Sequence, residues 1–441
     1  MTARSISQLP LDDNSNGWSG ILETRQPNAP LVGEQNADWV VLGAGFAGLA
    51  AARRLAENRP QDRIILLEAN EVGEGASGRN SGFAIDLPHN VGSSMAELEG
   101  SHRYMALARA AIEYHEKQID KYNIQCDWSQ PGKYHAAVTG QGAHEVLEPF
   151  AEELKALGEP FQWIDKENLD KRLGTRHFNA AVHTPGCRTM NPAALTRGLA
   201  DNLPENVFLH ENSAVVGFEQ AGGIRLTTAK GRLSAPKMIL CVNGFADRFG
   251  FYPRKLLTFA ANASLSRRLT SEEHSALACE KNWALTPVNA FAGITMRYTN
   301  DHRLLIRQNI YFNPAMRESE VHRTRIKASH KNLFDQRFPM LPDVNMEYTW
   351  TGYICLSQNG SPGFGQIAPD VYASVCQNAV GVTKGTIGGL LAADMACNQD
   401  NELIGYMQSL GQPDRVPPRP FLDLGVRAKF AWEIWKSRAE A

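Results

Sequence analysis

Residues 38–50 read DWVVLGAGFAGLA, and this stretch decides the fold. Its apolar run, 39–42, predicts a strand buried on both faces. Three glycines follow, and residues 49–58 then predict a helix that stops before Pro60. A strand, a glycine-rich turn and a helix in this order are typical of a dinucleotide-binding βαβ unit.

The three glycines would serve separate purposes in such a unit. Gly43 allows a tight turn, Gly45 lets the backbone approach a pyrophosphate, and Gly48 lets the helix pack close to the strand. The helix N-terminus adds free N–H groups and the positive end of its dipole. A second predicted strand, 63–67, ends at Glu68, whose carboxylate can accept hydrogen bonds from a ribose diol. A purely structural βαβ unit is the alternative. The dinucleotide site is favoured because the strand, the glycine turn, the helix, the second strand and the acidic residue all occur in the expected order.

Two more segments are rich in glycine. Residues 73–83 hold four glycines among small polar residues, too many for a helix or a strand, so we expect a loop. Its position after the second strand predicts that it lies against a cofactor, with a flexible loop as the alternative. Residues 381–393 begin with spaced glycines and continue as a small-residue helix, whose N-terminus can stabilise negative charge on a ring system.

Composition excludes several classes of protein. The chain has 441 residues, 43% of them hydrophobic, and a formal net charge of −2, so no basic excess favours nucleic-acid binding. No run approaches the roughly twenty apolar residues that span a bilayer, and the polar N-terminus lacks the core of a signal peptide. Seven scattered cysteines form no zinc-binding spacing, which predicts reduced thiols in a cytoplasmic protein without a metal site.

The remaining patterns predict a second domain. The apolar run 238–242 predicts a return to the first sheet, whereas residues 294–299 and 304–311 alternate around an Asn-Asp turn, as in an antiparallel hairpin. A long helix, 101–124, carries His115 on its apolar stripe, where a buried structural histidine is more typical than a catalyst. The predicted division is a leader strapped over the surface, 1–37; a discontinuous nucleotide-binding domain, 38–120, 186–254 and 346–400; a substrate domain, 121–185 and 255–345; and a C-terminal tail, 401–441.

The tail contains a predicted amphipathic helix. Its apolar stripe comprises Leu424, Ala428, Ala431, Trp432 and Trp435. Arg427 and Arg438 flank this stripe, and Lys429, Glu433 and Lys436 are expected opposite it. We expect this stripe to dock on the protein itself. Peripheral contact with a membrane surface is the alternative, because basic helices with aromatic residues also lie on lipid.

Taken together, these blocks resemble the FAD-dependent amine and amino-acid oxidoreductases of the D-amino-acid oxidase superfamily, most closely its gamma-glutamylputrescine oxidase branch. The resemblance covers roughly residues 37–396. It implies an α/β fold (α+β overall), with a Rossmann-like FAD-binding domain and an inserted, sheet-rich antiparallel substrate domain. The segments that carry it are GAGFAG (43–48), GASGRNSG (75–82), DHRLLI (301–306), WTGY (350–353), SPGFG (361–365) and the helix after Gly381.

The resemblance also implies the residues that hold FAD. No His or Cys occurs in residues 75–82 to form a covalent link, so FAD bound non-covalently is expected, with Cys355 as the one alternative tether. Gly43, Gly45 and Gly48 would hold the pyrophosphate, Glu68 would hold the ribose, and Val215 would contact the adenine. The isoalloxazine would lie against Ser77, Gly78, Arg79, Asn80, Ser81 and Gly82, and its pyrimidine edge against Gly381, Val382, Thr383 and Lys384. Further cofactor-binding candidates are Phe46, Ala47, Ala69, Ala76 and Gly244.

The implied reaction is the oxidation of a C–N bond in a small-molecule amine or amino acid. Hydride passes to flavin N5, and the imine hydrolyses to a carbonyl compound and an amine or ammonia. Alternatives are a dehydrogenase that passes electrons to a quinone or carrier protein, and a non-catalytic flavoprotein or scaffold. A nicotinamide-dependent dehydrogenase is disfavoured by residues 75–82.

Two departures from the branch affect the substrate site. Residues 378–382 read NAVGV and lack the histidine of the branch's SGHGV, and Arg307 replaces a glycine on the second strand of the predicted hairpin. Arg307 is either a solvated arginine paired with a surface carboxylate or a two-pronged ligand for a substrate carboxylate. Lys384 is either a positive charge beside the flavin or a surface lysine.

Overall fold

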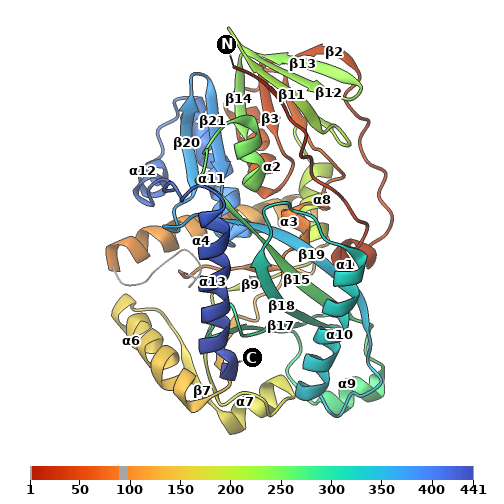
Figure 1. Ribbon diagram of the computed structural model, residues 1–441, viewed down its shortest axis with the longest axis vertical. Helices are drawn as coiled ribbons and strands as arrows, with labels where there is room; N and C mark the ends of the chain where they lie inside the picture. The colour runs from red at the N-terminus through yellow and green to blue at the C-terminus, as the bar shows by residue number, and fades with distance from the viewer. Residues whose placement is uncertain (1, 89–97, 441) are drawn as a thin grey trace.

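The computed structural model describes residues 2–88 and 98–440 (Figure 1). A six-stranded and a five-stranded sheet form one half of the molecule, and an eight-stranded sheet forms the other half below it. The chain passes between the halves several times, because each of the two large sheets contains strands from distant parts of the sequence. The α/β fold with an added antiparallel sheet is therefore confirmed.

The six-stranded sheet carries the predicted nucleotide-binding unit. All neighbouring strands are parallel except the last pair. The return to this sheet expected at residues 238–242 is confirmed, because residues 237–240 form a strand that pairs directly with the first one. In spatial order the strands are β10 (Val207–His210), β4 (Ile64–Leu67), β3 (Trp39–Leu42), β14 (Lys237–Leu240), β21 (Val371–Val375) and β20 (Gly363–Ala368).

Strand β3 is buried on both faces, as predicted. Trp39 and Val41 pack towards the helices, whereas Val40 and Leu42 pack towards the five-stranded sheet, so alternate side chains enter different cores. This arrangement explains a continuous apolar run where a one-sided sheet would alternate. The helices on this side are α2 (Phe46–Asn58), α4 (Leu98–Tyr122), α8 (Pro192–Asp201) and α11 (Thr386–Ala396).

The N-terminal segment is built into the fold. Its first strand pairs antiparallel with one edge of the five-stranded sheet, and its second pairs parallel with the other edge. Trp18, in the short helix α1 (Gly17–Gly20), is only 2% exposed. The leader is therefore more than the expected surface strap. The sheet runs β1 (Thr2–Ser5), β11 (Val215–Gln220), β12 (Ile224–Thr228), β13 (Gly231–Ala235) and β2 (Gly33–Asn36).

The eight-stranded sheet contains the predicted hairpin. Strands β17 and β18 pair antiparallel, and all neighbours in this sheet do so except β16 and β6. Strand β19 lies in this sheet, although the predicted domain division assigned residues from 346 onward to the other domain. The order is β19 (Met346–Leu356), β15 (Leu257–Ser266), β18 (Leu304–Phe312), β17 (Thr295–Tyr298), β16 (Trp283–Pro287), β6 (Lys133–Ala137), β8 (Ala180–Thr184) and β7 (Gln162–Asp165).

Shorter elements complete the molecule. The glycine-rich segment 73–83 was expected to lack regular structure, and this is wrong. Its centre is the short helix α3 (Ala76–Arg79), and it ends in β5 (Phe83–Ala84), which pairs with β9 (Arg188–Thr189). The remaining elements are α5 (Gly140–Gly142), η1 (Ala143–Leu147), α6 (Glu148–Leu157), α7 (Lys166–Leu173), η2 (Asn243–Phe249), α9 (Ser271–Leu277), α10 (Glu320–Arg337), η3 (Gly381–Gly385), α12 (Glu402–Ser409), α13 (Phe421–Lys436) and η4 (Arg438–Glu440).

Helix α13 docks on the eight-stranded sheet by a different face from the predicted one. Its contact residues are Leu422, Val426 and Phe430, whereas Trp432 and Trp435 of the predicted stripe are 58% and 55% exposed. The helix carries two apolar stripes, and periodicity alone does not decide which one meets the core.

Candidate active site

The turn after β3 has the predicted geometry. Gly43 adopts a φ of +98°, a conformation that side chains rarely allow. A Cβ on Gly48 would lie 1.7 Å from the carbonyl oxygen of Gly43, so only glycine permits this approach of helix to turn. Helix α2 starts at Phe46, and Gly45 has no side chain to cap it. The positive end of the helix dipole therefore faces the adjoining pocket.

Glu68 lies at the carboxyl end of β4, on the wall of the same pocket. Its carboxylate accepts hydrogen bonds from the N–H groups of Ala44 (2.8 Å) and Asn70 (3.2 Å). Burial raises the pKa of Glu68 in spite of these bonds. Val215 and Ala69 lie on the pocket wall with it, as expected for an adenosine-binding end.

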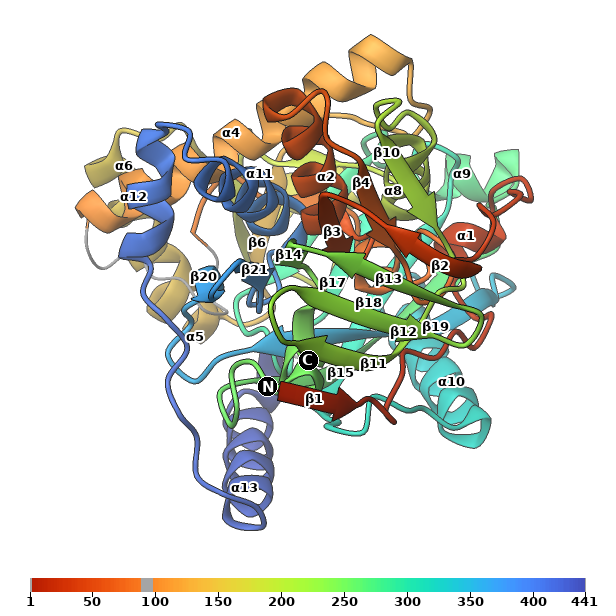
Figure 2. The same ribbon diagram turned by 90° about the horizontal axis from the view of Figure 1, so that it is seen from above.

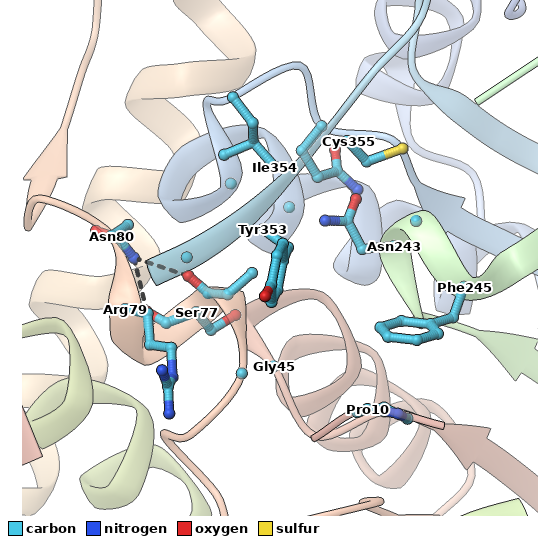
Figure 3. A pocket seen from close by; sticks show the side chains of 18 of the residues that line it. Pro10, Gly45, Ser77, Arg79, Asn80, Asn243, Phe245, Tyr353, Ile354 and Cys355 are labelled. Atoms are coloured by element: carbon cyan, nitrogen blue, oxygen red, sulfur yellow. Dashed lines mark hydrogen bonds between the residues drawn. The ribbon is translucent and has the colours of Figure 1, made fainter. Parts of the chain in front are cut away.

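Segment 73–83 forms the next part of the wall. Any side chain at Gly78 would prevent helix α3 from forming, because a Cβ there would lie 1.8 Å from the Gly73 oxygen. The glycines of this segment, which were expected to exclude a helix, therefore include the one that permits it. The Ser77 hydroxyl accepts a hydrogen bond of 2.9 Å from the N–H of Phe46, which ties the segment to the start of α2. Tyr353 projects into the space between Ser77 and Phe245 (Figure 3).

The N-terminal residues 8–13 cover part of this pocket, which the sequence did not indicate. Asp12 and Asp13 form ion pairs with Arg79 at 2.7 and 2.9 Å, and Asp13 also contacts Arg323. Burial opposes ionisation of Asp13, but the two guanidinium groups hold its pKa below the usual value. Arg79 therefore links segment 73–83, which was predicted to bind the cofactor, to the N-terminal residues that cover the pocket.

The turn before α11 forms the opposite wall. Gly381 and Val382 line the pocket there, as does Gln377, whose side-chain oxygen is buried and has no hydrogen-bond partner among the described residues. Behind this turn, His115 of α4 contacts the Val382 carbonyl oxygen and the Thr386 hydroxyl through Nε2. The prediction of a buried histidine in a structural role agrees with this position.

Lys384 does not belong to the surface. Its side chain is 4% exposed, and Nζ lies 5.3 Å from the centre of the Tyr104 ring in α4. Burial lowers the pKa of Lys384 to about 8. The surface alternative is therefore wrong, while a role beside the flavin stays a prediction because the side chain lies behind the pocket wall.

Arg307 reaches the pocket from the eight-stranded sheet. Nη2 donates a hydrogen bond of 2.7 Å to the Thr295 hydroxyl, and Nη1 lies 3.5 Å from the Ala290 oxygen. No described acidic side chain forms an ion pair with it, so the pairing with a surface carboxylate is wrong. Burial lowers the pKa of Arg307 to about 10, still far enough above neutrality to keep the group cationic.

Most predicted cofactor residues lie on one continuous wall, and the others support it from behind. For example, a Cβ on Gly82 would lie 2.1 Å from Nη1 of the buried Arg297. The wall includes Gly43, Gly45, Phe46, Ala47, Glu68, Ala69, Ala76, Ser77, Arg79, Asn80, Ser81, Val215, Gly244, Gly381 and Val382; it does not include Gly48, Gly78, Gly82, Thr383 or Lys384. Residues on the wall that were not expected to bind cofactor or substrate include Phe291, Thr295, Ile310, Glu318, Tyr353 and Gln377.

These features fit a long nucleotide cofactor. The pocket extends from Glu68 and Val215, past the glycine turn, to Arg307 on the second sheet. Gly45 leaves backbone exposed at the helix start, and the open oxygen of Gln377 can accept a hydrogen bond from a bound group. A parallel sheet with this turn, next to a sheet that bears the second part of the pocket, defines a dinucleotide-binding protein.

Comparison with known proteins specifies the class. The chain belongs to the FAD dependent oxidoreductase (DAO) family, whose model matches residues 38–395. Its cofactor is therefore FAD, and the resemblance to the D-amino-acid oxidase superfamily is confirmed.

Individual relatives agree with this family. A probable oxidoreductase, OrdL, of Haemophilus influenzae is 27% identical over 90% of this chain and 91% of its own length. Gamma-glutamylputrescine oxidoreductase of Escherichia coli is 26% identical over 81% of this chain and 83% of its own length. The crystal structure of glycine oxidase from Geobacillus kaustophilus superimposes with a TM-score of 0.72 at 18% identity, covering 87% of this chain and all of that one, which establishes the fold.

Proposed function

We propose that the protein oxidises a C–N bond in a small-molecule amine that also carries a carboxylate. The observation that carries this proposal is Arg307, a cation on the pocket wall without an acidic partner among the described residues. The names of the relatives support the amine part, since one is a gamma-glutamylputrescine oxidoreductase and the structural neighbour is a glycine oxidase.

The surroundings of Arg307 favour an anionic ligand. One N–H is used by Thr295, and the contact with the Ala290 oxygen is at the limit of a hydrogen bond, so other guanidinium donors remain for a carboxylate. Burial without a counter-ion disfavours the charged arginine, and a bound carboxylate would remove that penalty. The nearby His330, with its pKa lowered by burial to about 4, is neutral and supplies no competing charge.

The rest of this wall would orient the amine. Phe291, Ile310 and Tyr353 provide apolar surface that can exclude water from the reacting carbon. When bound, FAD supplies the acceptor for a hydride from the C–H bond beside the amine nitrogen, and the resulting imine hydrolyses in water. The contribution of this chain is then to fix the carboxylate at one end and so position the amine at the other.

The test is Arg307→Lys, compared on two substrates. Lysine keeps the charge but loses the planar fork, so kcat/KM for a gamma-glutamyl amine or N-substituted amino acid should fall by about 10- to 150-fold, equivalent to about 1.5–3 kcal/mol. The same amine without its carboxylate should react as with the wild type. The variant should retain its flavin, and Arg225→Lys, on an exposed part of β12, serves as the matched control.

Two results would contradict the proposal. Equal kinetics of wild type and Arg307→Lys on both compounds would remove Arg307 from the substrate site. A flavin that no amine reduces would favour a non-catalytic flavoprotein. Following the reoxidation of the reduced protein with oxygen and with a quinone then separates an oxidase from a dehydrogenase.

A further inference from the structure

Helix α13 lies along the outside of the molecule, with one long face towards the sheet and another away from it (Figures 1 and 2). On the inner face, Phe430 stacks on Phe259 with ring centres 4.8 Å apart and meets Phe291 edge-on at 4.7 Å. The segment after the helix is anchored by Glu440 of η4, whose carboxylate accepts a 2.7 Å hydrogen bond from the N–H of Val138. These contacts hold α13 in place without any use of its outer face.

The outer face is apolar and aromatic. Phe421, Leu424, Trp432 and Trp435 are 70%, 67%, 58% and 55% exposed, and the two indole rings stack with centres 5.1 Å apart. Their spacing places them on one side of the helix, with exposed alanines at 428 and 431 between them. We call this surface the tryptophan face. Isolated exposed apolar residues are ordinary, but a contiguous stripe of this size indicates a binding surface.

Cations border the tryptophan face on both sides. Helical spacing places Arg427 along one edge, and Lys429 and Lys436 along the other. Arg438, in η4 just after the helix, holds its guanidinium 4.8 Å from the centre of the Trp435 ring. None of the four forms an ion pair with another described residue. The acidic residues of the helix lie on its inner half, so the outer half is strongly basic in a chain whose net charge is −2.

We propose that the tryptophan face docks on the surface of a lipid bilayer that contains anionic lipids. Indole rings prefer the boundary between headgroups and acyl chains, and cations at both edges would meet lipid phosphates. Among the described residues no helix has the length and apolar character needed to cross a membrane, so the contact is peripheral.

A second copy of the chain fits this face less well. In a two-fold symmetric contact the same stripe would meet itself, and the basic edges of one helix would face those of the other. Such like-charge contacts are unfavourable, whereas an anionic surface complements both edges. The charge pattern therefore favours lipid.

Docking would also place the pocket close to the membrane. Phe291 and Ile310, which contact the inner face of α13, also lie on the pocket wall. A helix with its side chains is about 10–12 Å in diameter, so about this distance would separate the lipid surface from the substrate side of the pocket.

The proposal is tested by co-sedimentation of the FAD-loaded protein with vesicles. Phosphatidylcholine vesicles are compared with vesicles in which about one-third of the lipid is phosphatidylglycerol, at about 0.05 M and 0.5 M salt. The wild type should sediment with the anionic vesicles at low salt and much less in the other conditions. Lys429→Gln and Lys436→Gln should each weaken partitioning about fivefold, and Trp432→Glu with Trp435→Glu should abolish it.

Trp163→Glu is the matched control, because Trp163 is an exposed tryptophan (43%) on β7. It should bind vesicles like the wild type, and all variants should keep their flavin and melting temperature. A wild type that stays in solution with every vesicle would overturn the proposal. So would a wild-type dimer that Trp432→Glu with Trp435→Glu converts to monomers without any change in lipid binding, since a second copy would then cover the face.

Discussion

Replacing Gly45 with valine tests how the cofactor is held. The backbone at Gly45 is extended (φ −80°, ψ −175°), so any residue can adopt it and no strain is expected. A Cβ there would lie 2.6 Å from the Ser77 hydroxyl, well inside van der Waals contact. Ser77 cannot turn away freely, because it accepts the hydrogen bond from the Phe46 N–H. The new side chain would therefore fill the space at the helix start, and we expect a folded protein with little or no FAD.

The loss of FAD determines how far the free energy of unfolding falls in this variant. With free FAD at about 100 times its dissociation constant, binding stabilises the folded state by about 2.7 kcal/mol, and Gly45→Val should lose this contribution. The assays are the flavin-to-protein absorbance ratio and melting with and without added FAD. Gly405→Val, at an exposed position of helix α12, is the control, since a Cβ there meets no atom within 4 Å. Full flavin occupancy in Gly45→Val, with wild-type melting, would refute the reasoning.

Three further predictions concern other parts of the molecule. Acid precipitation should release free FAD from a colourless pellet, whereas a yellow pellet that turns colourless in Cys355→Ser would show a covalent link. Burial lowers the pKa of His115 to about 4, so the unfolded state binds more protons between about pH 6.5 and 4; stability should fall by about 3 kcal/mol as the pH drops through this window, and denaturant titrations of His115→Gln should show a smaller fall. Phe430→Ala should cost about 2 kcal/mol of unfolding free energy and Trp432→Ala less than about 0.5 kcal/mol, and the reverse order would mean that α13 docks by its other face.

The nucleotide-binding half could be predicted because its constraints are local. Gly43 is required by its own φ of +98°, and Gly48 is required by its approach to the oxygen of Gly43, five residues earlier. The two-sided burial of β3 is also visible in its composition. The short helix α3 was missed because the glycine count opposed a helix, whereas Gly78 is the residue that lets this turn close.

Long-range contacts explain what could not be predicted. The cover formed by residues 8–13 depends on ion pairs of Asp13 with Arg79 and Arg323, which are distant in the sequence and form no pattern. Strand alternation could place Arg307 on a face of its strand, but whether that face meets solvent or a pocket depends on the other half of the molecule. The same limit applies to Lys384, whose burial comes from α4.

The most direct test of the proposed function is an anaerobic titration of the purified protein with paired amines, monitored by flavin absorbance. Each pair consists of an amine with a carboxylate, such as an N-substituted amino acid or a gamma-glutamyl amine, and the same amine without it. We predict that members with the carboxylate bleach the flavin and that their partners do so far more weakly. Flavin that dithionite bleaches but no amine reduces, or equal bleaching by both members of every pair, would contradict the account.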